Sequence, residues 1–176
     1  MEDPEFIERL RQRERDAMEA LVVRHHADVY RFLRHLTRHR QEAEDLAQAT
    51  LLRALDRIDA YAGTGSLRSW LLGVAYREFT GWRRRRLWLP ILGDRPAPGD
   101  AFNDLAEAEA LLAAIARLPD SLRATFLLFH VEEVPLAEVA LTLAIPEGTV
   151  KSRLHAARAR LRQTLREEDA YVPEAC

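Results

Sequence analysis

The sequence of 176 residues is poor in cysteine, glycine and proline, with one, seven and eight of them respectively. Its single thiol, Cys176, excludes a disulfide framework or a cysteine-rich metal site within one chain. No apolar run reaches the length of a membrane span, and the acidic segment 1–5 lacks the apolar core of a signal peptide. These absences predict a cytoplasmic protein without membrane insertion.

Long alternating runs of β-branched residues, which mark strands, are also missing, whereas alanine, leucine, arginine and glutamate dominate. Because 48% of the residues are apolar, the chain can bury packed cores. Since helix-forming residues dominate and strand patterns are missing, we predict an all-α protein. Helical spacing of apolar residues predicts a short helix within residues 1–15 and further helices over about 16–39, 41–58, 66–86, 105–118, 121–131, 136–143 and 146–168. In the 41–58 helix, five apolar side chains are expected to face the core: Leu46, Ala49, Leu52, Ala54 and Leu55.

Residues 87–104 interrupt the helical pattern with three prolines, two glycines and several acidic residues. This composition predicts a flexible acidic linker. We therefore expect two small helical domains, residues 1–86 and 105–176, on either side of it.

The net charge of −2 hides an uneven distribution of charge. Residues 83–86 are four consecutive arginines, and residues 151–166 carry six cationic side chains and no acidic one. Since the field at a phosphate depends on local charge more than on the sum, nucleic-acid binding must be judged from these two basic patches.

The second basic patch follows the pattern of a helix-turn-helix. A short helix over 136–143 and the turn Ala144–Pro146 precede a longer helix, and proline suits a first helical position because no donor is lost there. The early turns of the second helix in such a motif read base edges in the major groove. The residues predicted to contact DNA are Thr149, Lys151, Ser152, Arg153, His155 and Arg158. The alternative is a merely solvated basic face, which the turn and the basic bias together disfavour.

Four segments of this half resemble the fourth conserved region of sigma-70 family factors: Leu118–Pro119, Arg123, Glu138–Ala140 and Gly148–Leu154. In the N-terminal half, Ala43–Ala54 is similar to the polymerase-binding helix of the second region, and Gly65–Leu71 matches the start of its promoter-binding helix. The resemblance covers about residues 16–86 and 105–166. A short chain with only these two regions looks like the extracytoplasmic-function (ECF) group.

The resemblance implies that the N-terminal half docks on the clamp helices of the largest catalytic subunit of RNA polymerase core. The residues implied in docking are Glu44, Asp45, Gln48 and Arg53. Three of them would form an acidic, hydrogen-bonding patch suited to a basic partner. The alternative is that they are ordinary surface polar residues.

The resemblance also implies that the segment 61–65 captures a flipped base of the −10 element, with arginines of the following helix contacting phosphates. The residues implied in −10 binding are Tyr61, Gly63, Thr64, Gly65, Arg77, Arg83, Arg84, Arg85 and Arg86. For Tyr61, and likewise for Trp70, core packing is the alternative that we favour. The chain has Tyr76-Arg77 and Gly81-Trp82 where the family has an Arg-Asn pair and then an Asp, which predicts an altered −10 preference.

The function implied is that of an ECF sigma factor, which reads the −35 duplex with its helix-turn-helix and the melted −10 strand with its N-terminal domain. Its implied partners are RNA polymerase core, promoter DNA and an anti-sigma factor. One alternative is a stand-alone helix-turn-helix regulator that acts as a dimer. An enzyme is disfavoured, because His25, His26, His35 and His39 form no metal or catalytic motif and are expected to be solvated. No catalytic residue, metal or cofactor is expected.

Overall fold

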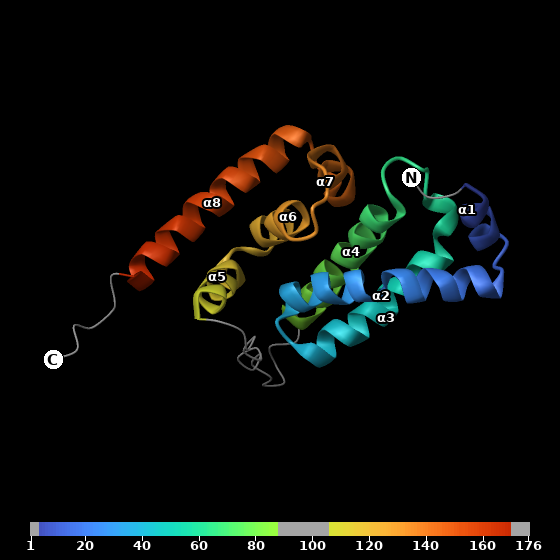
Figure 1. Ribbon diagram of the computed structural model, residues 1–176, viewed down its shortest axis with the longest axis horizontal. Helices are drawn as coiled ribbons and strands as arrows, with labels where there is room; N and C mark the ends of the chain where they lie inside the picture. The colour runs from blue at the N-terminus through green and yellow to red at the C-terminus, as the bar shows by residue number, and fades with distance from the viewer. Residues whose placement is uncertain (1–3, 88–105, 170–176) are drawn as a thin grey trace.

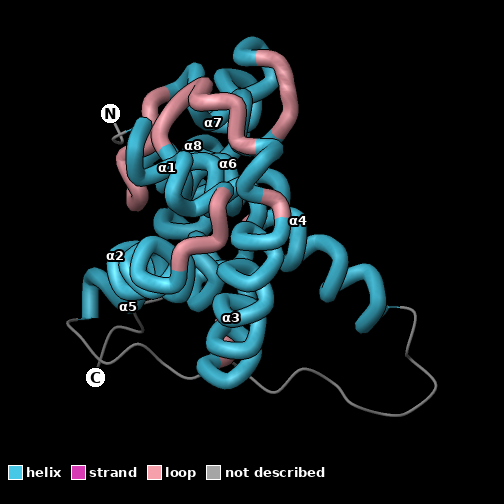
Figure 2. Tube along the Cα trace, turned by 90° about the vertical axis from the view of Figure 1, so that its right-hand side faces the viewer, coloured by secondary structure: helices cyan, strands magenta, loops and turns pink. Residues whose placement is uncertain are grey.

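The computed structural model describes residues 4–87 and 106–169, and every element in these ranges is a helix (Figure 1, Figure 2). The elements in chain order are α1 (Pro4–Arg11), α2 (Arg15–Thr37), α3 (Arg40–Asp56), the 3-10 helix η1 (Ile58–Ala60), α4 (Leu67–Leu87), α5 (Ala106–Arg117), α6 (Asp120–His130), α7 (Leu136–Leu143) and α8 (Glu147–Asp169). The all-α prediction is confirmed. The predicted linker lies almost wholly outside the described residues.

The N-terminal core forms between the long helices α2, α3 and α4. Phe32 of α2 and Phe79 of α4 are fully buried there, surrounded by leucines of all three helices. The short helix α1 closes one end of this core by burying Leu10 completely. Its Arg11 guanidinium donates a hydrogen bond to the carbonyl of Tyr61, 3.2 Å away. The first helix is therefore part of the N-terminal core and also holds the start of the 61–65 loop.

The inward face of α3 differs from the predicted one at two positions. Leu46 and Ala54 are buried as expected, but Ala49 is exposed and 66% of Leu52 is accessible to solvent. Leu51 is buried in place of Leu52, because α3 packs against both α2 and α4 and so buries a broader stripe on one side. The prediction for Ala49 and Leu52 was wrong, and both lie on the solvent face.

The C-terminal core is built around α6, which packs against α7 and α8 and whose Leu127 and Leu128 are fully buried. The end of α7 is set by Ala144, which takes the left-handed conformation with φ 53°. The amide of Ile145 then donates to the carbonyl of Ala140 at 3.0 Å, and α8 begins at Glu147. The predicted helix-turn-helix is thus formed by α7 and α8.

The two helical groups also contact each other. Helix α7 packs against α4, and α6 packs against α2 (Figure 1). The helix-turn-helix therefore lies directly beside the helix that carries the N-terminal basic patch.

Candidate nucleic-acid interface

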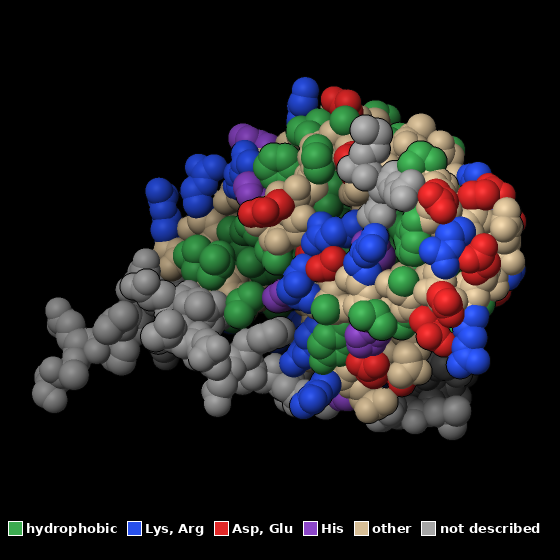
Figure 3. Space-filling model, turned by 45° about the vertical axis from the view of Figure 1, so that its right-hand side comes forward, with side chains coloured by type: hydrophobic (Ala, Val, Ile, Leu, Met, Phe, Trp, Pro, Cys, Tyr) green, Lys and Arg blue, Asp and Glu red, His purple; other side chains and the backbone are tan. Residues whose placement is uncertain are grey.

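The residues predicted to contact DNA on α8 are exposed to different degrees. Lys151, Ser152, His155 and Arg158 are exposed, whereas Arg153 is half-buried. Val150, Leu154, Ala157 and Leu161 anchor the opposite side of the helix in the C-terminal core. Cationic side chains project in a row along this edge of the molecule (Figure 3). Because the anchoring side is buried, the basic side is free to face a groove.

One residue that positions this basic side was not foreseen from the sequence. His130, at the end of α6, lies 3.2 Å from the guanidinium of Arg158. Its ring sits against Phe126 and Phe129, with ring centroids 4.6 and 4.9 Å away. His130 is exposed as a whole, but partial burial of its ring, assisted by the charge of Arg158, lowers its pKa, and the neutral ring accepts the hydrogen bond from Arg158. The sequence signal was the pair Phe126 and Phe129, four residues and one residue before the histidine.

The 61–65 loop is held in shape from within. Tyr61 is only 5% exposed, and its hydroxyl donates a hydrogen bond to the carbonyl of Gly65 at 2.8 Å. Its ring lies against that of Trp70, with centroids 5.6 Å apart. Gly63 and Gly65 have φ values of 73° and 86°, a region that favours glycine. In this structure Tyr61 shapes the loop, while residues 62–65 are the exposed part.

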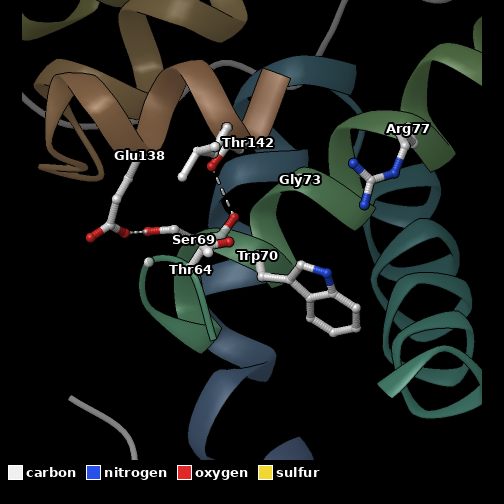
Figure 4. A pocket seen from close by; sticks show the side chains of 9 residues that line it. Thr64, Ser69, Trp70, Gly73, Arg77, Glu138 and Thr142 are labelled. Atoms are coloured by element: carbon white, nitrogen blue, oxygen red, sulfur yellow. Dashed lines mark hydrogen bonds between the residues drawn. The ribbon is translucent and has the colours of Figure 1, made fainter. Parts of the chain in front are cut away.

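A pocket of about 150 Å³ lies where this loop meets α4 and α7 (Figure 4). Thr64, Gly65 and Arg77, which were predicted together as −10 residues, all line it. Trp70 forms part of its wall and is half-buried. The other side is lined by Glu138, Leu141 and Thr142 of α7. Burial, together with the charge of Arg57, lowers the pKa of Arg77.

The arginine run at the end of α4 is partly engaged in ion pairs. Arg83 pairs with Asp120 of α6 at 2.6 Å. Arg86 pairs with Glu42 of α3 and stacks over the ring of Trp82 at 5.3 Å. Arg84 and Arg85 are exposed. The structure thus directs two arginines of the run to solvent and two to carboxylates. 

The four residues predicted to dock on polymerase do not form one flat acidic patch. Asp45 and Gln48 are exposed on α3, and Glu44 is half-buried and lies 3.2 Å from His26 of α2. Arg53 pairs with Glu78 of α4 at 3.5 Å. Leu52, one helical turn after Gln48, completes an exposed face with Asp45, Gln48 and Ala49, which we call the α3 face. In the sequence, the spacing of four residues between Gln48 and Leu52 indicates that both lie on the same face of the helix.

The histidines differ from the expectation of solvated side chains. His25 is only 4% exposed inside α2, and burial lowers the pKa of His35. The prediction was wrong for His25, because Leu21 and Val29, four residues before and after it on α2, belong to the core. Among the described residues no group of three histidine, cysteine or acidic side chains is placed to hold a metal ion. In the same ranges, no helix has the length and apolar character needed to cross a membrane.

Comparison with known proteins agrees with this arrangement. Residues 21–89 match the family described as sigma-70 region 2, and residues 108–161 match sigma-70, region 4. The fold resembles that of the sigma factor RpoE from Bartonella quintana, solved in complex with the anti-sigma factor NepR, with a TM-score of 0.71 at 23% identity over 84% of this chain and 96% of that one. The fold and the two matched regions define a sigma-70-type transcription factor.

Full-length relatives narrow this class. The chain is 34% identical to the ECF RNA polymerase sigma factor SigL of Mycobacterium tuberculosis, over 85% of this chain and 89% of the relative. It is 28% identical to the ECF RNA polymerase sigma factor SigW of Bacillus subtilis, over 92% of this chain and 95% of the relative. The protein belongs to the ECF group of the sigma-70 family of RNA polymerase sigma factors.

Proposed function

We propose that this chain directs RNA polymerase core to specific promoters and initiates transcription, with residues 1–86 and 105–176 acting as two domains. The observation that carries the proposal is the pairing of two different surfaces in one chain. One is a helix-turn-helix with an exposed cationic helix, and the other is the exposed α3 face beside a glycine-shaped loop. A duplex reader and a single-strand reader are the two parts that promoter opening requires.

The helix-turn-helix reads the −35 element as duplex. The first turns of α8 enter the major groove, where Thr149, Ser152 and Arg153 face base edges. Lys151, His155 and Arg158 contact the phosphates, because they follow one exposed side of the helix. His130 holds Arg158 in place for this contact through the hydrogen bond at 3.2 Å. A single motif of this size binds weakly alone, so further contacts are required.

The N-terminal domain supplies those contacts by trapping the melted −10 strand. The exposed residues 62–65 and the pocket beside them receive the flipped base, while Arg77, Arg84 and Arg85 contact phosphates. Trapping an open strand stabilises the melted state relative to the duplex, so no covalent step by this chain is needed. Tyr61 acts by shaping the loop and not by stacking on a base, since its ring is buried.

The α3 face docks on the clamp helices of the largest polymerase subunit. Asp45 and Gln48 supply the polar contacts, and Leu52 adds an apolar one at the C-terminal end of the face. Arg53 contributes by tying α3 to Glu78 of α4. The chain works in the cytoplasm, where polymerase and promoter DNA are found. An anti-sigma factor is its proposed regulator, supported by the likeness of its fold to a sigma factor solved with such a partner.

Reconstituted transcription tests the proposal. The full chain is added to core polymerase with a library of genomic promoter fragments, and transcripts are mapped. We expect discrete start sites that disappear with the double variant Asp45→Ala/Gln48→Ala, whose helix remains folded because both side chains are exposed. Absence of any start site across the library would overturn the proposal. Tight binding to two-fold symmetric sites by a dimer without polymerase would instead favour the stand-alone regulator.

A further inference from the structure

The first helix is the part of the N-terminal half to which the proposed function gives no role. Helix α1 ends before the match to sigma-70 region 2 begins at residue 21. It is nevertheless docked on the core, since Leu10 is fully buried and Ile7 is only 8% exposed. Helix α1 packs against both α2 and η1 (Figure 1). It therefore lies beside the segment that leads into the 61–65 loop.

Two carbonyls of that segment accept hydrogen bonds from arginines at the end of α1. The Arg11 guanidinium donates to the carbonyl of Tyr61 at 3.2 Å, and the Arg13 guanidinium donates to the carbonyl of Asp56 at 3.5 Å. Arg13 also lies 3.7 Å from the Asp56 carboxylate. Asp56 ends α3 and Tyr61 directly follows η1, and the last carbonyls of a helix have no donor within it. Because the dipole of a helix favours a cation at this end, the two arginines stabilise the ends of α3 and η1.

The backbone after α1 is bent so that both arginines reach this place. Arg13 takes the left-handed conformation with φ 59°, and its amide donates to the carbonyl of Leu10 at 3.1 Å. A residue other than glycine keeps this conformation only where the surrounding contacts hold it. The contacts of Arg13 with Asp56 belong to those that hold it. The bend and the two arginines thus form one connection between α1 and the end of η1.

The Tyr61 carbonyl is the point at which α1 acts on the loop. This carbonyl belongs to the peptide unit that joins buried Tyr61 to Ala62, the first exposed residue of the loop. Because a peptide unit is planar, a hydrogen bond to its oxygen orients the whole unit. The Tyr61 hydroxyl donates at the same time to the carbonyl of Gly65 at 2.8 Å. Arg11 therefore fixes the direction in which the loop leaves η1, and the hydroxyl fixes where it returns.

We propose that Arg11 is a positioning residue for −10 recognition, which orients the exposed residues 62–65 toward the captured strand through the Tyr61 carbonyl. The inference rests on the proposed function of that loop. A loop that is already held in its binding conformation loses less conformational freedom when a strand binds, so its affinity is higher. The Arg11 guanidinium also lies 3.7 Å from the carboxylate of Glu8, one turn earlier in α1. Its charge is therefore paired within α1, and Arg11 acts through the loop and not on a phosphate.

The test compares two arginines of α1 in the full chain. Arg11→Met removes the donor to the loop and keeps a long, helix-forming side chain. Arg9→Met is the matched control, because Arg9 pairs with Glu14 at 2.7 Å and 41% of its side chain is exposed, against 39% for Arg11. Both substitutions remove one ion pair and one positive charge from α1, so a general loosening of α1 would appear in both variants. Arg11→Lys keeps a charged donor and should recover part of the parent behaviour.

The order of the loop is measured first, by NMR relaxation of the free chain. The probes are the backbone amides of Gly63 and Gly65, the two glycines of the loop. We expect their order parameters to fall in Arg11→Met and to stay at the parent value in Arg9→Met. Unchanged order parameters in Arg11→Met, or an equal fall in both variants, would overturn the positioning role. This measurement does not depend on polymerase or promoter DNA.

Strand binding is then measured on core polymerase carrying each variant, with a fluorescent single-stranded oligonucleotide that contains the −10 sequence of a mapped promoter. The affinity of Arg11→Met should fall about fivefold if the binding conformation then makes up about a fifth of the loop population. The slope of log affinity against log salt should stay at the parent value, because no phosphate contact is lost. The affinity of Arg9→Met should match that of the parent.

The outcomes separate the inference from the proposed function. A reduced salt slope in Arg11→Met would make Arg11 a phosphate ligand and overturn its positioning role. Unchanged strand affinity despite a loosened loop would overturn the link between Arg11 and −10 recognition. Absence of promoter-specific transcripts with the parent chain would count against the proposed function, while the order parameters would still decide whether Arg11 holds the loop.

Discussion

The hydroxyl of Tyr61 donates a hydrogen bond to the carbonyl of Gly65, 2.8 Å away, and so closes the loop that joins η1 to α4. The bond spans the two glycines with positive φ and leaves only residues 62–65 facing solvent. A buried aromatic side chain thus determines the shape of a surface that it does not itself present. This relationship gives the first prediction.

Replacing Tyr61 by Phe removes the hydroxyl while keeping the ring against Trp70. The loss of one hydrogen bond should cost about 1 kcal/mol of the free energy of unfolding, measured by urea denaturation. Promoter opening should fall further than stability alone explains, because the loop loses its closure. Tyr30→Phe, at a half-buried tyrosine of α2, is the control. Equal loss of opening in both variants would contradict the role of the Tyr61 hydroxyl.

Leu52 provides a test of the α3 face. Since 66% of its surface is exposed, Leu52→Lys should leave the melting temperature close to that of the parent. The affinity of the Leu52→Lys variant for core polymerase should fall about tenfold, the loss typical of one buried anchor in an interface. Leu111→Lys, at another exposed leucine on α5, should bind normally. Titration of labelled core polymerase measures both, and normal binding by Leu52→Lys would exclude Leu52 from the interface.

The basic side of α8 can be separated from its opposite flank by a pair of single substitutions. Lys151 and Arg160 lie nine residues apart and so point to opposite flanks of the helix at 100° per residue. Lys151→Ala should weaken binding to a selected promoter and reduce the slope of log affinity against log salt by about 1. Arg160→Ala removes the same charge and should leave the slope unchanged. Equal slopes for the two variants would mean that the side carrying Lys151 does not face the phosphates.

Acid should destabilise the fold through two histidines. Burial is the main cause of the lowered pKa of both His35 and His130. As the pH falls through 6.5, the unfolded chain therefore binds more protons than the folded chain. Their contribution to stability is therefore complete above that value and is lost below it. The melting temperature should fall between about pH 7.5 and about pH 5.5. His35→Gln, at a half-buried position, should lessen the fall, and His155→Gln, at an exposed one, should not; an identical fall in both would contradict the assignment.

Much of the local structure followed from the sequence itself. The spacing of apolar residues, the sequence Ala144–Pro146 and the basic bias of α8 predicted the helices and the helix-turn-helix, because these depend on neighbours within a few residues. The two conserved regions were visible for the same reason. Even the buried alternative for Tyr61 could be weighed, since it follows from the aromatic character of the residue.

Only the tertiary structure decided which side chains of each helix are buried and which are exposed. Leu52 is exposed and Leu51 buried because α3 packs on two partners at once, which no single-helix pattern reveals. Glu132 and Glu138 look like ordinary surface acids in the sequence, yet one is buried by arginines of the N-terminal half and the other is bound at the end of α4. Such pairings join residues more than sixty positions apart, and their energy depends on burial that exists only once both halves have folded and met.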